Sequence, residues 1–170
     1  MSQQKVTLRV SRFDPQRDGE PYLQTYEIDS RPGMSVLDAL FAVCDRLDNS
    51  LAFRYSCRGA ICGSCSMFIN GRHRLACATQ VSDFHEPITI HPLPGLTIIR
   101  DLVVDLDPFF AKYERVRPYL ITRSPAPERE RLQSPEERKR FDEMVNCILC
   151  ACCHSSCPIT WGNSEYLGPA

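Results

Sequence analysis

Ten cysteines in a chain of 170 residues, eight of them in two closely spaced groups, constrain this sequence more than any other feature. The first group comprises Cys57, Cys62, Cys65 and Cys77. The second group comprises Cys147, Cys150, Cys153 and Cys157, and Pro158 follows it directly. The first residues hold no apolar secretory core and no Arg-rich transit segment, so we expect the mature protein to start here, inside a cell. In a reducing compartment, clustered thiols indicate metal or redox chemistry instead of disulfides.

The spacing of the first group is typical of a 2Fe-2S cluster. Four residues separate Cys57 from Cys62, two separate Cys62 from Cys65, and Cys77 follows after eleven more. This is the plant-type ferredoxin pattern, in which four thiolates hold a flat cluster with two ligands per iron. Gly59 and Gly63 leave the loop free to turn tightly and to aim N–H groups at sulfur. A structural zinc site is the alternative, and it fits less well because zinc favours paired Cys-x2-Cys knuckles.

The second group has the spacing of a bacterial ferredoxin. In that pattern the three close cysteines bind one cubane cluster, and the cysteine before proline binds a different cluster. Both clusters need further ligands, and no cysteine follows Cys157. Of the two remaining cysteines, Cys44 lies on the apolar side of an expected helix, which indicates a buried structural thiol. Cys152 lies off the repeat, and we expect it to pack beside a cluster.

Composition excludes several classes of protein. The formal net charge is −1, which provides no electrostatic surface for nucleic acid. No apolar stretch approaches the 18 or so residues that a spanning helix needs, so we expect no direct membrane span. Four histidines are scattered over turns and motif edges, and we expect packing or surface roles for them.

The first part of the chain predicts a small α+β domain, which we place at residues 1–105. Alternating apolar residues predict a hairpin of strands at 6–10 and 22–28. Ser35, with Asp38 three residues later, predicts the start of an amphipathic helix packed on the sheet. Further along, Asn70-Gly71 predicts a second hairpin. Two more strands are expected, at 88–91 and 97–104.

The next segment, residues 106–133, predicts a helix and a linker. Asp107 as cap and Pro108 at the first helical position indicate a short helix that stops before Pro118. Residues 123–133 are Pro, Arg, Glu and small or polar residues with one Leu, which is typical of an exposed linker.

The last segment, residues 134–170, predicts the incomplete start of an all-α domain. The capping box from Ser134 to Glu137 begins a helix. Apolar residues from Phe141 to Ile148 are expected on one face of that helix, which leads directly into the second cysteine group.

Longer motifs around both groups identify a family. They are FRYSCRGAICGSC at 53–65, ING at 69–71, LAC at 75–77, CILCACC at 147–153 and YLGPA at 166–170. With these motifs in this order, the chain resembles the iron-sulfur subunit of succinate dehydrogenase or fumarate reductase, respiratory complex II, over essentially all its residues. The resemblance implies a β-grasp 2Fe-2S ferredoxin domain followed by the beginning of a bacterial-ferredoxin-like helical domain.

The resemblance also implies the ligands of three clusters. The 2Fe-2S cluster would be held by Cys57, Cys62, Cys65 and Cys77. Three of the four ligands of a 4Fe-4S cluster would be Cys147, Cys150 and Cys153. One of three ligands of a 3Fe-4S cluster would be Cys157. In relatives the remaining ligands come from a later segment, so we expect this chain to be a C-terminally truncated fragment; completion by a second polypeptide is the alternative.

By the same resemblance, electrons pass from succinate through an FAD-containing flavoprotein subunit and the clusters to a quinone. A membrane anchor subunit would hold the protein on the cytoplasmic face of a bacterial inner membrane, with the mitochondrial matrix face as the alternative. Pro158 and Trp161 would lie near the quinone. Many succinate-oxidising members have two tryptophans there, whereas this chain has Trp161 followed by Gly162. The quinone used and the direction of the reaction, succinate oxidation or fumarate reduction, therefore stay open.

A carrier of single electrons needs no acid or base of its own, so we nominate no catalytic side chains. A free-standing soluble 2Fe-2S ferredoxin is the rival within redox proteins, and the second cysteine group argues against it. A zinc scaffold is the rival outside them, and a protein without visible colour would favour it.

Overall fold

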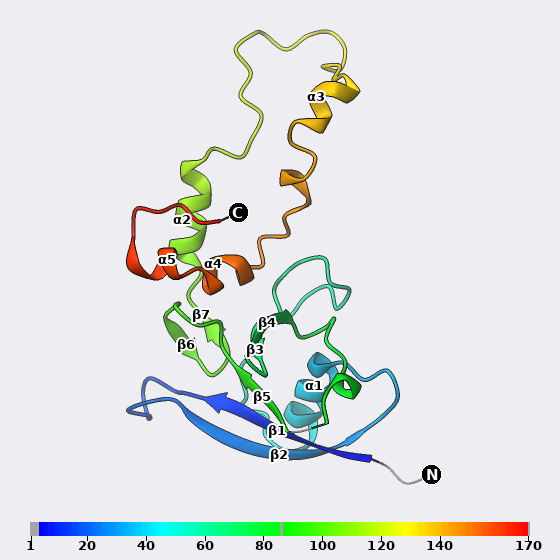
Figure 1. Ribbon diagram of the computed structural model, residues 1–170, viewed down its shortest axis with the longest axis vertical. Helices are drawn as coiled ribbons and strands as arrows, with labels where there is room; N and C mark the ends of the chain where they lie inside the picture. Colours follow the sequence, from blue (N-terminus) through cyan, green and yellow to red (C-terminus); the bar gives the residue numbers. More distant parts are fainter. Residues whose placement is uncertain (1–3, 86, 170) are drawn as a thin grey trace.

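The computed structural model describes residues 4–85 and 87–169, with a sheet at one end of an elongated molecule (Figure 1). Strands β1 (Gln4–Arg12) and β2 (Tyr22–Ser30) pair antiparallel over nine residues each, which confirms the first predicted hairpin. Alternate residues of a strand face the same side, so each strand contributes to one apolar face. The buried members of that face are Leu8, Val10, Tyr26 and Ile28.

The sheet has five strands in the order β2-β1-β5-β3-β4. Strand β5 (Ile88–His91) runs parallel to β1 and antiparallel to β3 (Ser66–Ile69), which pairs in turn with β4 (Arg72–Leu75). Asn70 and Gly71 both have positive φ (43° and 76°), as a two-residue hairpin turn requires. The second predicted hairpin is therefore confirmed. A short 3-10 turn, η1 (Val81–Asp83), precedes β5.

One helix, α1 (Val36–Arg46), packs on the sheet and completes the core. The Ser35 hydroxyl accepts from the Asp38 amide at 3.1 Å, and the Asp38 carboxylate accepts from the Ser35 amide at 3.0 Å, so the predicted capping box is present. The helix residues that enter the core are Val36, Leu37, Ala39, Leu40 and Val43. Each such aliphatic side chain larger than Ala contributes about 1.5–3 kcal/mol by its burial. The result is the predicted α+β, ferredoxin-like fold.

The predicted strand at 97–104 is wrong as a single strand. The chain forms β6 (Ile98–Arg100), reverses at Asp101, where φ is 47°, and returns as β7 (Val103–Val104). The buried Asp101 carboxylate accepts from Arg12 Nε at 2.9 Å and from the amides of Phe13 and Ala52 at 3.0 and 2.8 Å. The pattern of apolar residues does not predict this turn, because hydrogen bonds to a buried carboxylate stabilise it.

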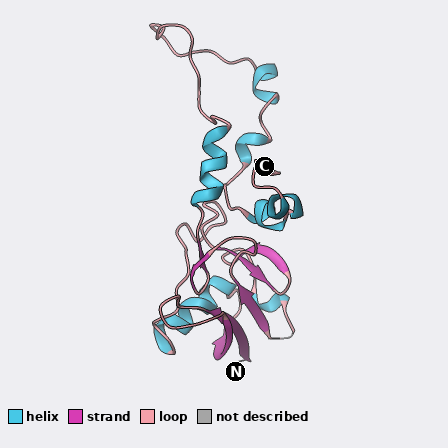
Figure 2. Cartoon of the chain, turned by 90° about the vertical axis from the view of Figure 1, so that its left-hand side faces the viewer, coloured by secondary structure: helices cyan, strands magenta, loops and turns pink. Residues whose placement is uncertain are grey.

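Helix α2 (Asp107–Arg115) confirms the predicted short helix and ends before Pro118. It begins at Asp107 itself, with Pro108 in its first turn, so Asp107 is not the cap that the sequence indicates. The acidic side chain there still favours the positive N-terminal end of the helix dipole. Every residue from 117 to 140 is exposed, and the long loop after α2 extends away from the sheet (Figure 2).

The helix predicted to run from Ser134 into the second cysteine group is much shorter in the structure. Its capping box is confirmed, but α3 (Pro135–Lys139) spans five residues and buries none of them. A 3-10 turn, η2 (Met144–Asn146), follows, then α4 (Cys152–Ser156) and α5 (Pro158–Gly162). Short helices are marginal without tertiary packing. The apolar residues that should extend this helix contact no core, so it stops.

Within the described residues, no helix combines the length and the apolar character that crossing a bilayer requires.

Candidate iron-sulfur site

Three cysteines of the first group, Cys57, Cys62 and Cys65, lie on an irregular loop between α1 and β3, and Cys77 follows β4. Three residues of the loop have positive φ: Arg58 (55°), Ala60 (59°) and Gly63 (71°). These left-handed residues fold the chain back on itself, so that backbone amides point inward. The amides of Gly59, Ile61 and Cys62 lie 3.4, 3.4 and 3.3 Å from Cys57 Sγ, and the Cys57 amide lies 3.4 Å from Cys62 Sγ.

The four thiols of this group meet in two pairs. Reciprocal amide-to-sulfur contacts place Cys57 beside Cys62. The β3–β4 hairpin returns Cys77 to Cys65, with the Cys77 amide 3.5 Å from Cys65 Sγ. Among the residues that the structure describes, no three His, Cys, Asp or Glu side chains gather around one point as ligands of a single ion do. Two pairs of thiols suit a group with two metal ions.

The environments of the two pairs differ. Hydrogen bonds from the Ser64 side chain and from the Cys57 amide lower the pKa of Cys62 to about 6, which favours the thiolate that binds metal. Burial raises the pKa of Cys65 to about 11. Cys57 is exposed, whereas Cys65 is buried. The loop therefore has one solvent-facing edge and one edge anchored in the core.

These features fit a 2Fe-2S cluster. The group needs two cysteines per iron, and its sulfurs accept hydrogen bonds from nearby backbone amides. Both are present: the pairs are Cys57 with Cys62 and Cys65 with Cys77, and the amides already point at Cys57 Sγ. These four thiols would hold the cluster and the loop amides would hydrogen-bond its sulfurs, and the cluster would supply one-electron chemistry.

The second cysteine group touches the loop of the first. A Cβ added to Gly63 would lie 2.7 Å from Cys150 Cβ and 2.9 Å from the Ile148 carbonyl oxygen. Only glycine lets the two backbones approach so closely. The sequence marked Gly63 for the tight loop, but it held no signal that this residue also meets Cys150. The two predicted cluster sites are thus neighbours.

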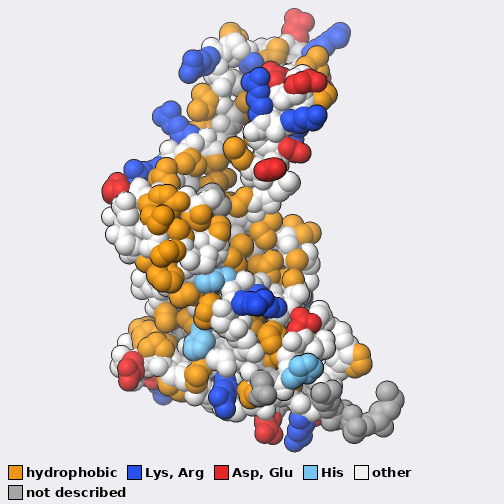
Figure 3. Space-filling view, viewed as in Figure 1, with side chains coloured by type: hydrophobic (Ala, Val, Ile, Leu, Met, Phe, Trp, Pro, Cys, Tyr) orange, Lys and Arg blue, Asp and Glu red, His pale blue; other side chains and the backbone are white. Residues whose placement is uncertain are grey.

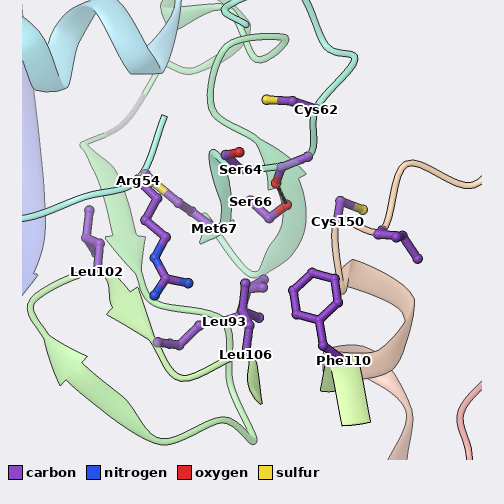
Figure 4. A pocket seen from close by; sticks show the side chains of 13 residues that line it. Arg54, Cys62, Ser64, Ser66, Met67, Leu93, Leu102, Leu106, Phe110 and Cys150 are labelled. Carbon is purple, nitrogen blue, oxygen red and sulfur yellow. Dashed lines mark hydrogen bonds between the residues drawn. The ribbon is translucent and has the colours of Figure 1, made fainter. Parts of the chain in front are cut away.

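A cavity of about 220 Å³ lies along this contact (Figure 4). The cavity is lined by Cys62 of the first cysteine loop, by Ser66 of β3, and by Leu149 and Cys150 of the second cysteine group. Arg54 also reaches into the cavity. The Ser66 hydroxyl donates to the Gly63 carbonyl at 2.5 Å. Ser66 faces the same cavity as Cys150 and, after the larger effect of Cys152, helps to lower the pKa of Cys150. Ser66 thus lies between both loops, a position that no sequence motif indicates.

Within the second group, the cysteines face different surroundings. Cys152 packs beside Cys150 as expected; a hydrogen bond between the two thiols lowers the pKa of Cys150 and raises that of Cys152. Burial raises the pKa of Cys153, which lies within electrostatic reach of Cys147 and Cys150. Cys157 follows α4, and the nearby Thr160 amide lowers the pKa of its thiol. That Cys157 serves a different cluster stays a prediction.

Helix α4 is fastened to the sheet by Ser155, whose side chain is almost fully buried (1% exposed). The Ser155 hydroxyl donates to the Pro94 carbonyl at 2.5 Å and lies 3.1 Å from His73 Nε2. The Trp161 indole donates to the Ser155 carbonyl at 3.0 Å and lies against Gly95, where no Cβ would fit. Of the predicted quinone-site residues, Trp161 therefore contacts the sheet region, and the exposed Pro158 begins α5.

Cys44, which was expected to be structural, packs against the main core and donates to the Leu51 carbonyl at 3.3 Å. Burial raises its pKa. It is therefore no part of either cysteine group.

A ferredoxin-like sheet with three thiols on a tight loop and a fourth returned to them by a hairpin defines the class of the protein, an iron-sulfur protein. A family model described as a 2Fe-2S iron-sulfur cluster binding domain matches residues 7–111.

Curated relatives identify the family more narrowly. The chain is 46% identical over 168 residues to the succinate dehydrogenase iron-sulfur subunit of Coxiella burnetii, covering 97% of this chain and 71% of that protein. It is 43% identical over 163 residues to the same subunit of Paracoccus denitrificans, covering 95% of this chain and 63% of that protein. The chain belongs to the family of succinate dehydrogenase iron-sulfur subunits, which are components of an oxidoreductase complex.

A solved structure agrees with this assignment. The chain is similar to one chain of the Mycobacterium smegmatis Sdh1 complex in the apo form, with a TM-score of 0.87 and 31% identity. The similarity covers 99% of this chain and 71% of the other.

Proposed function

We propose that this chain relays single electrons from a flavoprotein subunit, which exchanges two electrons with succinate or fumarate, to a membrane quinone. The observation that carries the proposal is the direct contact between the two cysteine loops at Gly63 and Cys150. A relay needs neighbouring redox sites with little protein between them. Membership of the succinate dehydrogenase family supports the identity of the reaction.

In this proposal the first region, residues 1–105, is the 2Fe-2S domain, with Cys57, Cys62, Cys65 and Cys77 as ligands. Residues 106–133 connect it to the start of a helical domain at 134–170. There Cys147, Cys150 and Cys153 bind a 4Fe-4S cluster, and Cys157 contributes to a 3Fe-4S cluster. This chain does not complete either of these ligand sets, because no cysteine follows Cys157.

The second region is the side on which we place the membrane anchor and the quinone. Hydrophobic side chains gather over α2, α4 and α5 on the face seen in Figure 3. Val116 at the end of α2 and Ile159 and Trp161 of α5 are 54, 56 and 57% exposed. Pro158 and Trp161 are the residues that we propose for the vicinity of the quinone. The protein would then be peripheral on the cytoplasmic face of a bacterial inner membrane.

The experiment that tests the first step is reconstitution of the chain with iron and sulfide under anaerobic conditions. We expect a coloured protein that gives a rhombic EPR signal after reduction with dithionite. Cys62→Ala should abolish that signal and remove the two irons of this cluster, because it leaves three thiolates where four are needed.

Cys44→Ala is the matched control, since Cys44 packs against the core outside both groups. It should keep the signal and the iron. A colourless, iron-free wild-type protein, or unchanged iron content in Cys62→Ala, would show that the ligand assignment is wrong.

A further inference from the structure

The loop that carries the first cysteines is weakly tied to the rest of its domain. Among the described residues, no hydrogen bond joins residues 53–62 to α1 or to the sheet; the loop's own amides point at its own sulfurs. Something other than backbone pairing must therefore hold these amides in place.

Side-chain contacts on Phe41 connect the loop to α1, and one of them comes from a charged residue. The Arg58 guanidinium carbon lies 4.4 Å from the centroid of the Phe41 ring and 5.5 Å from that of Tyr55. Phe41 belongs to α1 and packs edge-on against Tyr55 and Phe53, with centroids 4.6 and 5.4 Å away. A cation on an aromatic face is attracted by the negative face of the ring, and edge-on aromatic pairs add to this stabilisation.

The position of Arg58 in the chain lets this contact affect the amides that point at the Cys57 sulfur. Arg58 directly follows Cys57, and it lies in the left-handed region with φ 55°, which is strained for a residue other than glycine. The three amides on Cys57 Sγ belong to the next four residues. Losing the stacking would let the strained loop relax and move these amides away from sulfur.

An acidic side chain lies within electrostatic reach of Arg58. Asp38, half-buried at the start of α1, interacts with both Arg58 and Arg31. Its carboxylate also accepts two hydrogen bonds from Ser35, which hold it at the cap of the helix.

We propose that Arg58 is a positioning residue for the 2Fe-2S cluster: its stacking on Phe41 holds the amides of residues 59–62 on the Cys57 sulfur, and its charge favours the reduced state. The inference rests on the proposed function, because it takes Cys57 and Cys62 as ligands. Amide hydrogen bonds and a nearby cation both stabilise the more negative, reduced form, so both raise the reduction potential.

The test uses the reconstituted chain and compares Arg58→Met, Arg58→Lys and Phe41→Leu with the wild type. Two quantities are measured: the midpoint potential, by EPR-monitored titration, and the rate of iron loss to a chelator. Arg58→Met should lower the potential most, and Arg58→Lys, which keeps the charge, should lower it less. All three variants should lose iron several-fold faster. Arg31→Gln removes the other cation that acts on Asp38, one without a stacking contact among the described residues, and should keep the wild-type rate of iron loss.

The outcomes separate the two proposals. A wild-type protein without a 2Fe-2S signal overturns the proposed function and this inference together. A wild-type signal with unchanged potential and iron loss in Arg58→Met overturns the inference alone. If Arg58→Met holds no cluster, Arg58→Lys decides: a potential and a rate of iron loss equal to the wild type overturn the role of stacking, and a partial fall in potential with faster loss supports it.

Discussion

Two regions of the molecule each carry a group of four cysteines: the sheet region, residues 4–105, and the following region, residues 106–169. They differ in how much apolar core packs beneath these cysteines. Every residue of the main apolar core comes from the sheet region. The smaller core shares Leu93 and Val104 of the sheet region with Phe109 and Ala151. Residues 117–140 bury nothing. The first cysteine loop therefore rests on a core of its own, whereas the second depends on contact with the first.

Buried polar groups show the same contrast. In the sheet region, the Arg12 guanidinium is buried and reaches the carboxylates of Asp48 and Asp101 and the hydroxyl of Tyr26. In the following region, Ser155 provides the main buried polar link, and it points back into the sheet region. The first cysteine motif therefore lies within a domain that has its own core, whereas the second motif is held by its contacts with that domain.

The largest effect is expected from Asp101→Ala. Its removal leaves Arg12 buried with one carboxylate fewer and frees two backbone amides, so the free energy of unfolding should fall by about 3–5 kcal/mol. Urea unfolding followed by circular dichroism measures this. Asp29→Ala, at an exposed position of β2, is the control and should stay within about 0.5 kcal/mol of the wild type. Equal effects of the two substitutions would contradict the stabilising role of the buried network around Arg12 and Asp101.

The second largest effect is expected from acid, which should destabilise the sheet region. Hydrogen bonds from Ser50, Tyr26 and Arg12 hold the pKa of Asp48 well below its usual range. This pKa is lower in the folded state than in the unfolded state, so the ionised Asp48 carboxylate stabilises the fold fully above about pH 4. As the pH falls below about 4, this stabilisation is lost, by an amount on the order of 2 kcal/mol. Urea midpoints measured between pH 6 and pH 2 should show this loss. Asp48→Asn should be less stable at pH 6 and should lack this part of the pH dependence.

Ser155→Ala should loosen the contact between the two regions without unfolding the sheet. It leaves His73 Nε2 and the Pro94 carbonyl without their partner, which costs about 1–2 kcal/mol. Hydrogen exchange should show faster exchange in α4 and unchanged protection in β1 and β5. Ser156→Ala, at the exposed neighbouring position, should change neither. Loss of protection throughout the sheet would mean that the two regions unfold as one.

The smallest effect is expected from Ser134→Ala, which removes the cap of α3. A lost cap costs a helix about 1 kcal/mol. Since α3 buries no residue, global unfolding should not change measurably, and only local exchange in α3 should become faster. A clear fall in the urea midpoint would show that α3 packs against something in solution. Ser35→Ala, the same change at the cap of the buried α1, is the matched comparison and should lower the midpoint.

Local signals predicted the sheet region well. The hairpin at Asn70-Gly71 and the capping box at Ser35 each depend on residues within a few positions of one another, and both are confirmed. The turn at Asp101 was missed because its partners, Arg12 and Ala52, are 89 and 49 residues away. The helix after Ser134 was predicted too long because its cap is local, whereas its length depends on packing that the described chain does not offer.

The sequence by itself determined the chemistry: cysteine spacing is a covalent property of the chain, and it predicts which thiols can share a cluster before any fold is known. Only the tertiary structure decided which groups surround these thiols. It placed Gly63 against Cys150, Ser66 between both loops and Arg58 on Phe41. Such contacts depend on distances in space between residues far apart in the chain, and no local pattern encodes them.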